Sequence, residues 1–347
     1  HRLRKREKAL MRLLTVTLML GLLLIVSPAP VLSQAPRSSP PPAPSSGREE
    51  RTVSDWAAST FSLSAGYRTD DLDWNIAGTR QGSDPNVLSE LNWSDVTIYV
   101  LKLTNRTVIR DRIYLRGELD YGVVVSGDNR DSDYGADNRT QEFSRSVNGV
   151  DGNSVWDGSV GVGPHFSFLG SRVRLCPLLG YAVARQDFNI VDGYQALAEP
   201  PATTATGPID GLDSRYHTRW VGPWIGLDLL LAMPFEKGFI RCVELLFSGE
   251  YHWVDYSADA DWNLRSDLQH PVSFTHEAEG RGLTVGAMMQ FETRSRWGFN
   301  FGMSMMALST DPGLDRVYAA DGSIAETRLN EVNWRRFTLE AGLSYRF

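Results

Sequence analysis

Cysteine is scarce in this chain, because only Cys176 and Cys242 occur among its 347 residues. Two cysteines are too few for the disulfide framework of a small secreted domain. By our strand assignment another strand lies between them, which separates them by about 10 Å. Neither lies at a metal-ligand spacing. The sequence therefore predicts neither a disulfide bridge nor a cysteine-held metal.

Several other features are missing as well. No stretch after residue 33 is long and apolar enough to cross a membrane as a helix. The net charge of -7 argues against a nucleic-acid partner. The chain contains no phosphate-binding glycine loop, no zinc motif and no Ser-His-Asp order. We therefore predict no cofactor and no nucleic-acid partner.

The N-terminal segment has the composition of a targeting signal. Basic residues precede an apolar run from Met11 to Val26, and two prolines follow it. This order predicts a secretory signal peptide over residues 1–33, with Met11 as an alternative start; an uncleaved anchor is the other interpretation. Residues 34–55 are rich in Pro and Ser and predict an extended linker. Residues 56–347 then form one domain.

The last eleven residues alternate strictly between two faces. One face is apolar and consists of Phe337, Leu339, Ala341, Leu343, Tyr345 and Phe347. The other face is mostly polar and consists of Thr338, Glu340, Gly342, Ser344 and Arg346. A period of two with one apolar face predicts a strand between lipid and water. The terminal aromatic resembles the assembly signal of bacterial outer-membrane barrels; the last strand of a soluble sandwich is the alternative.

Similar alternation recurs along the domain and predicts ten strands. They lie near residues 60–76, 90–105, 110–126, 155–168, 172–190, 217–234, 239–256, 281–293, 297–308 and 332–347. Every second connection is only a few residues long, whereas the others run from about thirteen to nearly thirty residues and are rich in Gly, Asp, Asn and Ser. This asymmetry is typical of outer-membrane proteins. The predicted fold is a ten-stranded antiparallel transmembrane β-barrel with long extracellular loops and short periplasmic turns.

Two side-chain patterns support a barrel in a membrane. The inner face of the predicted strands carries charges of both signs, which indicates a polar, hydrated or ion-paired lumen. These residues are Arg112, Arg116, Glu118, Asp120, Glu244 and Glu250. Tryptophans near strand ends predict an interfacial girdle. They are Trp74, Trp93, Trp156, Trp253, Trp297 and Trp334.

Local sequences add a family resemblance over about residues 60–347. The relevant segments are Glu90-Leu91-Asn92-Trp93, Leu175 to Tyr181, Pro223-Trp224-Ile225-Gly226-Leu227, and Asp131-Ser132-Asp133-Tyr134. In this order, on ten predicted strands, they resemble the omptins, the outer-membrane proteases of Gram-negative bacteria. The resemblance implies an outer-membrane location and an acidic barrel mouth that accepts basic peptides.

The resemblance also implies a catalytic arrangement. In the omptins two acidic residues face an Asp and a His across the mouth, and a water between them attacks the scissile bond. Asp131 and Asp133 match the first pair, and Asp261 matches the family aspartate. Asn263 occupies the histidine position, and an amide cannot take the proton. His276, near the mouth, is the candidate replacement base.

Three functions remain open. The first is an omptin-like endopeptidase that cleaves basic peptides with an Asp-activated water. The second is a non-proteolytic or divergent surface and binding protein on the same fold, and Asn263 favours it over the first. The third, a small-solute channel, is disfavoured because the charged inner residues predict a lumen plugged by ion pairs. Expected partners are outer-membrane lipids, lipopolysaccharide among them, and cationic peptides or proteins at the acidic mouth.

Overall fold

The computed structural model describes residues 57–202 and 204–347, and these residues form strands joined by turns and loops. The predicted signal peptide and linker, residues 1–33 and 34–55, lie outside this range. The strands are β1 (Ala57–Ile76), β2 (Ser89–Ile109), β3 (Ile113–Ala136), β4 (Thr140–Asp151), β5 (Ser154–Pro164), β6 (Phe166–Phe168), β7 (Val173–Ala198), β8 (Gly207–Pro234), β9 (Ile240–Asp261), β10 (Phe274–Thr293), β11 (Trp297–Thr310), β12 (Gly313–Tyr318) and β13 (Ile324–Arg346). No helix in the described part of the chain is long and apolar enough to cross a membrane.

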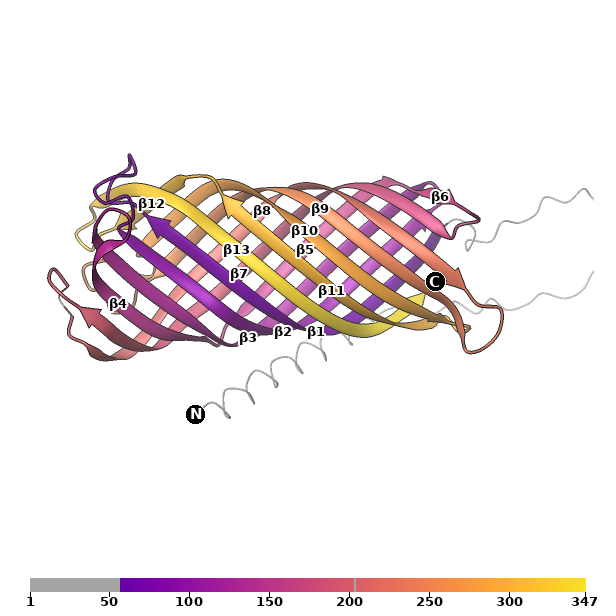
Figure 1. Ribbon diagram of the computed structural model, residues 1–347, viewed down its shortest axis with the longest axis horizontal. Coiled ribbons are helices and arrows are strands. Elements are labelled where there is room, and N and C mark those ends of the chain that lie inside the picture. Colours follow the sequence, from indigo (N-terminus) through magenta and orange to yellow (C-terminus); the bar gives the residue numbers. More distant parts are fainter. Residues whose placement is uncertain (1–56, 203) are drawn as a thin grey trace, which may run out of the picture.

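The strands form one closed antiparallel sheet. β1 pairs with β2 on one side and with β13 on the other, which closes the ring. β4, β5 and β6 follow one another in a single position of the wall beside β7. β11 and β12 share the position between β10 and β13. The ring therefore has ten strand positions, and the predicted ten-stranded barrel is confirmed (Figure 1).

A belt of exposed apolar side chains surrounds the half of the barrel that contains the short turns. Its members include Leu119, Val160, Leu179, Ile225, Phe247, Leu283, Met303 and Leu339. Exposed aromatics border the belt on both sides: Tyr67, Tyr99, Tyr181 and Trp253 on the side of the long extensions, and Phe61, Phe239, Trp297 and Phe347 on the side of the short turns. Such girdles mark the two membrane interfaces of a transmembrane barrel.

The two ends of the barrel differ. Short turns (residues 110–112, 169–172, 235–239 and 294–296) lie at one end together with the C-terminus (Figure 1). At the other end several strands continue far beyond the belt; β3, for example, runs from its last large exposed belt residue, Leu119, on to Ala136. Much of the sequence predicted as long outer loops is therefore strand. The outer face of these extensions meets water and not lipid, so it lacks the apolar residues whose alternation marks a membrane strand.

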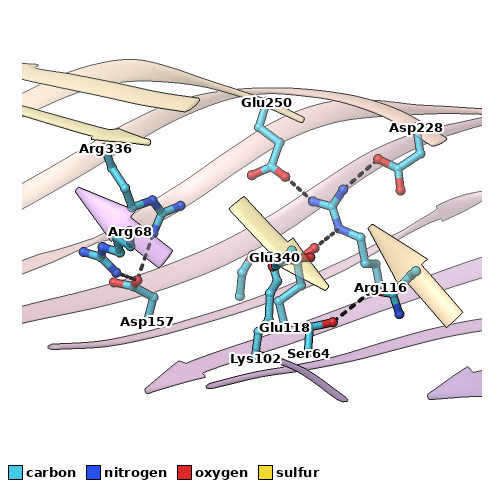
Figure 2. A network of polar contacts seen from close by, with 12 residues as sticks. Ser64, Arg68, Lys102, Arg116, Glu118, Asp157, Asp228, Glu250, Arg336 and Glu340 are labelled. Atoms are coloured by element: carbon cyan, nitrogen blue, oxygen red, sulfur yellow. Dashed lines mark hydrogen bonds and ion pairs between the residues drawn. The ribbon is translucent and has the colours of Figure 1, made fainter. Parts of the chain in front are cut away.

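The lumen within the belt is filled by paired charges, as predicted. Arg116 donates hydrogen bonds to Asp228 and Glu250 from two other strands, and Lys102 lies 3.0 Å from Glu118 (Figure 2). Further ion pairs join Arg68 and Arg336 to Asp157, Lys102 to Glu340, and Arg106 and Arg174 to Glu244. We call this set the charged layer. Arg112, predicted to face inward, is instead exposed in the first short turn.

Above the charged layer the lumen is apolar and aromatic, which the sequence analysis missed. Trp93 stacks on Tyr216 with ring centroids 4.9 Å apart, and Trp220 packs on Tyr256 at 4.4 Å. We call the group formed by Trp74, Trp93, Phe188, Tyr216, Trp220, Tyr256, Phe274 and Trp334 the aromatic plug. Trp74, Trp93 and Trp334 are at most 3% exposed, so their predicted place in the girdle was wrong. Trp253 and Trp297 do lie in the girdles.

Candidate functional site

The outer mouth of the barrel contains an inward-facing row of polar side chains on β3. Asp131 pairs with Leu91 of β2, and Asn129 pairs with Trp93. Leu91 and Trp93 are 1% exposed and belong to the core that fills the lumen. Because directly paired residues of an antiparallel sheet point to the same face, Asn129 and Asp131 point into the barrel as well. Asp133, two residues further along the strand, shares this face.

β4 extends this polar lining. Its residues Ser144, Ser146 and Asn148 pair with Asp133, Asp131 and Asn129, respectively. Asn148 donates hydrogen bonds to Asn129 and to Ser146 Oγ, at 2.8 and 2.9 Å. We call the patch formed by these six residues the vestibule; it lies on the inner face of β3 and β4, and Asn129 pairs with Trp93 of the aromatic plug. The sequence analysis missed the β4 residues because it assigned their segment to a loop, and the alternation of small polar residues at 144, 146 and 148 was the only available signal.

Burial shifts the proton affinity of the two aspartates, which lie beyond the apolar belt. Burial and the neighbouring carboxylate of Asp133 raise the pKa of Asp131 well above its usual range. Burial also raises the pKa of Asp133, although hydrogen bonds from Ser89 and Ser144 oppose this shift. Two buried carboxylates of like charge hold a proton tightly unless a cation comes close. The pair is therefore an electrostatic site in need of positive charge.

The cation that attracts both vestibule aspartates is hydrogen-bonded to another carboxylate. Arg265, in the loop between β9 and β10, attracts both vestibule aspartates electrostatically. Its guanidinium, however, makes two hydrogen bonds to Asp267, from Nε at 2.8 Å and from Nη2 at 2.7 Å. This bidentate pair uses both sides of the Asp267 carboxylate and largely neutralises the arginine. Arg265 thus moderates the negative charge of the vestibule without forming a direct ion pair with Asp131 or Asp133.

Two buried acceptor atoms in the vestibule lack a donor within the described residues. They are Oδ1 of Asp131 and Oδ1 of Asn148, and Asn148 is only 7% exposed. A buried acceptor without a partner is costly, and native proteins normally satisfy it with water, an ion or a ligand. Since both atoms accept hydrogen bonds, a ligand that satisfies them has to donate. Ammonium and guanidinium groups do so and also neutralise the aspartates.

His276, the candidate base, lies in the aromatic plug. It is 0% exposed, and its ring lies 4.7 Å from that of Trp74. Its Nδ1 lies 2.9 Å from the Tyr216 hydroxyl, and its Nε2 lies 3.2 Å from the carboxylate of Asp315. Only Nδ1 makes a hydrogen bond, to Tyr216, whereas Nε2 faces Asp315 without one. The structure places this histidine in the core below the vestibule.

Asp261 and Asn263 have local roles at the rim. Asp261 follows Ala260, which is 1% exposed and faces the lumen, so Asp261 lies on the opposite face of β9. Its carboxylate is 2.6 Å from Nδ1 of His270. Asn263 donates to the carbonyl of Gly211 and accepts from Ser214 Oγ, which ties its loop to β8. The structure thus brings Asp131 and Asp133 together but does not bring Asp261 or His276 to them.

The chemistry available in the vestibule follows from this geometry. Two carboxylates, two amides and two hydroxyls can bind a cation and orient its donors. A water between the aspartates would need a neutral imidazole or another base within about 3 Å to act as a nucleophile at neutral pH. His270 lies against Asp261, and His276 bonds Tyr216. Within the described residues no group of three His, Cys, Asp or Glu side chains forms a metal site.

Comparison with known proteins supports the architecture. A family model described as Pom, Protochlamydia outer membrane protein, matches residues 62–347. The solved structure of the outer membrane protease OmpT from Escherichia coli is similar with a TM-score of 0.66 and 15% identity, over 84% of this chain and 97% of that chain. At this identity the similarity concerns the fold alone. Membership of the omptin family, expected from the sequence, is not shown.

More distant similarities also involve outer-membrane barrels. The translocator domain of the autotransporter NalP from Neisseria meningitidis aligns with a TM-score of 0.30 and 11% identity, over 86% of this chain and 90% of that chain. A FadL homologue from Pseudomonas aeruginosa aligns with a TM-score of 0.26 and 10% identity, over 84% and 90%. No curated protein sequence matches the chain.

Proposed function

The chain belongs to the Protochlamydia outer membrane protein family, and we propose that it is a non-proteolytic binding protein of the outer membrane. In this proposal the outer mouth of the barrel binds cationic ligands. The observation that carries the proposal is the buried, partnerless Oδ1 of Asp131 beside the carboxylate of Asp133. A cationic donor satisfies the acceptor and relieves the repulsion between the two carboxylates. Basic side chains of peptides or proteins provide such donors at the cell surface.

The polarity of the vestibule favours the charged end of a basic side chain over an apolar ligand. The small hydroxyl and amide side chains of Ser144, Ser146 and Asn148 on β4 lie directly beside the polar side chains of β3 on the same face of the sheet. A guanidinium has five donors in one plane, so it can reach Asp131 and Asn148 together. An ammonium provides three donors from one point. We therefore propose arginine-containing ligands as the better fit.

Binding without cleavage is the second part of the proposal. His276 is 0% exposed and packs within the aromatic plug beside Tyr216 and Asp315, and Asn263 cannot take a proton from water. Hydrolysis of a peptide bond by water needs a base at the attacking oxygen. With a bound cation in contact with both carboxylates, the aspartate pair is not free to activate a water for attack on the peptide bond.

A single experiment tests both parts. The refolded barrel, in micelles that contain lipopolysaccharide, is titrated with a fluorescent peptide that carries adjacent arginines. Anisotropy reports binding, and mass spectrometry of the same samples reports cleavage. We expect saturable binding of the intact peptide. Asp131→Asn should weaken it by about tenfold or more, because a charge-assisted hydrogen bond contributes about 1.5–3 kcal/mol.

Asp128→Asn provides the matched control. Asp128 lies on β3 three residues before Asp131, is exposed, and adjoins Asn129 on the opposite face of the strand. Its substitution removes the same charge from the same strand outside the vestibule, so binding should fall less than twofold. Equal losses in the two variants would mean that the general negative charge of the surface, and not the vestibule, attracts the peptide. Cleavage that requires Asp131 would instead support an endopeptidase.

A further inference from the structure

The short-turn end of the barrel carries a regular pattern of charge that the vestibule does not explain. Each of the four short turns contains at least one exposed basic side chain, and the turns of residues 110–112 and 294–296 contain two. Four basic side chains, one in each turn, form the pattern. They are Arg112, Arg172, Lys237 and Arg296. In the described structure none of these four side chains takes part in a hydrogen bond or ion pair. The turns belong to strand pairs distributed around the ring, so the four cations are spread around the whole end of the barrel.

Each of these cations stands beside a large exposed apolar side chain. Ile113 follows Arg112 and is 45% exposed, and Leu169, in the turn of Arg172, is 76% exposed. Phe239, near Lys237, is 72% exposed, and Trp297, after Arg296, is 56% exposed. A soluble surface would gain nothing from this repeated pairing. It suits a boundary where hydrocarbon ends and charged headgroups begin.

The height of the four cations relative to the membrane is fixed by the lower aromatic girdle. Trp297 contacts Tyr345, with ring centroids 5.0 Å apart, and Tyr345 contacts Phe347 at 4.9 Å. Phe347 in turn lies 5.5 Å from Phe61 on β1. This connected row of rings marks the interface, and the turn residues 294–296 come directly before it. The exposed cations therefore lie at the level of the headgroups.

Arginines at the opposite end of the barrel differ from these four cations in their contacts. Several there have acidic partners, as in the pairs of Arg80 with Glu326, Arg139 with Glu90, Arg145 with Glu142 and Arg281 with Asp311. In the short turns Arg294 is also engaged, because it donates to the carbonyls of Phe235 and Gly238 and joins two neighbouring turns. The four exposed cations make no such contacts, and their turns also contain two exposed carboxylates, Asp111 and Glu236.

We propose that Arg112, Arg172, Lys237 and Arg296 form a ring of binding sites for anionic phospholipid headgroups in the leaflet next to the short turns. Short turns of outer-membrane barrels face the periplasm, so this is the periplasmic leaflet. Each site combines a cation for the lipid phosphate and a neighbouring apolar side chain for the acyl chains. The ring fixes the vertical position of the barrel in the membrane and surrounds it with anionic lipid.

Lipid retention tests the proposal. The protein is reconstituted into nanodiscs with equal amounts of phosphatidylglycerol and phosphatidylcholine, then released into mild detergent and analysed by native mass spectrometry. We expect several-fold enrichment of phosphatidylglycerol, reduced at high salt because these sites are exposed. With all four cations changed to Gln, the retained lipid should return to the ratio of the bulk mixture. Lys237→Gln with Arg296→Gln should give an intermediate value.

Arg130→Gln with Arg215→Gln is the matched control, since these two exposed arginines lie on the long extensions at the opposite end. This double variant should retain the wild-type enrichment. Heat-modifiable migration in gels verifies folding of each variant. Equal enrichment in the wild type and the fourfold variant would overturn the proposal, as would no enrichment in the wild type. Displacement of the lipid by soluble glycerol phosphate at a similar concentration would also overturn it, because a free phosphate would then be the ligand.

Discussion

Arg116 on β3 and Asp228 on β8 meet across the lumen, with 2.6 Å between Nη1 and Oδ1. The side chains are 3% and 0% exposed. Arg116 also donates to Glu250 on β9 and lies 4.9 Å from the ring centroid of Trp224. One guanidinium therefore connects three strands of the wall. The middle of the barrel is held by paired charges that would be costly to leave single.

Removal of this guanidinium should destabilise the barrel strongly. Arg116→Met leaves Asp228 and Glu250 buried without their cation, which we expect to lower the free energy of unfolding by about 3–5 kcal/mol. Denaturant unfolding in micelles, followed by tryptophan fluorescence, measures the change. Adding Asp228→Asn and Glu250→Gln to Arg116→Met should restore part of the loss, since no unpaired charge then remains. An unfolding midpoint of Arg116→Met equal to that of the wild type would contradict the role of the charged layer.

The wild-type barrel should not conduct small ions in discrete steps. The charged layer occupies the lumen within the membrane, and the aromatic plug closes it above, with Trp93, Trp220 and Trp334 at most 2% exposed. Planar bilayer recordings after confirmed insertion test this expectation. Stable single-channel steps from the wild-type protein would show that the lumen opens to ions and would contradict this expectation.

Asp131 should make the protein less stable as the pH rises. Its pKa is raised in the folded state by burial and by Asp133, so the folded protein holds a proton that the unfolded chain releases. The stability from this group is present at low pH and is lost from the usual aspartate range upward to the raised pKa. Asp131→Asn should flatten this decline and stabilise the protein at pH 8. Thermal unfolding at several pH values provides the measurement, and identical profiles for variant and wild type would exclude the coupling.

His276 should matter for stability and not for ligand binding. His276→Ala removes a fully buried ring that packs on Trp74 and bonds Tyr216, which we expect to cost about 2–4 kcal/mol of unfolding free energy. The affinity for the basic peptide, measured under conditions where the variant remains folded, should change less than twofold. A variant that keeps its stability but loses affinity or turnover would place this histidine in the functional site.

The strands could be predicted from sequence because lipid on one side imposes a strict period of two. All ten predicted segments are strand positions in the ring. The same period could also have corrected the tryptophan girdle. On β1 the exposed residues Phe61 and Tyr67 are at odd positions, so Trp74 has the parity of the inner face. Proximity to a strand end was the weaker criterion, because a tryptophan there can face either lipid or the lumen.

The candidate site could be predicted only in part. The spacing of Asp131 and Asp133 places both on one face of any strand, and the structure confirms that they lie together. The partners on β4 could not be recognised, because outside the membrane Ser144, Ser146 and Asn148 follow no apolar pattern. His276 was misplaced for a physical reason: a buried histidine and an exposed one can be equally close to a strand end in sequence. Only the packing of Trp74 and Tyr216 around it decides between them.

The most direct measurement of the central claim is a crystal structure of the barrel grown with excess argininamide. We predict a guanidinium nitrogen within hydrogen-bond distance of Oδ1 of Asp131, with a second donor directed to Oδ1 of Asn148. Asp131→Asn crystals under the same conditions should show neither contact. An empty vestibule in the wild-type crystals, or argininamide only on the outer face of the strands, would contradict the account.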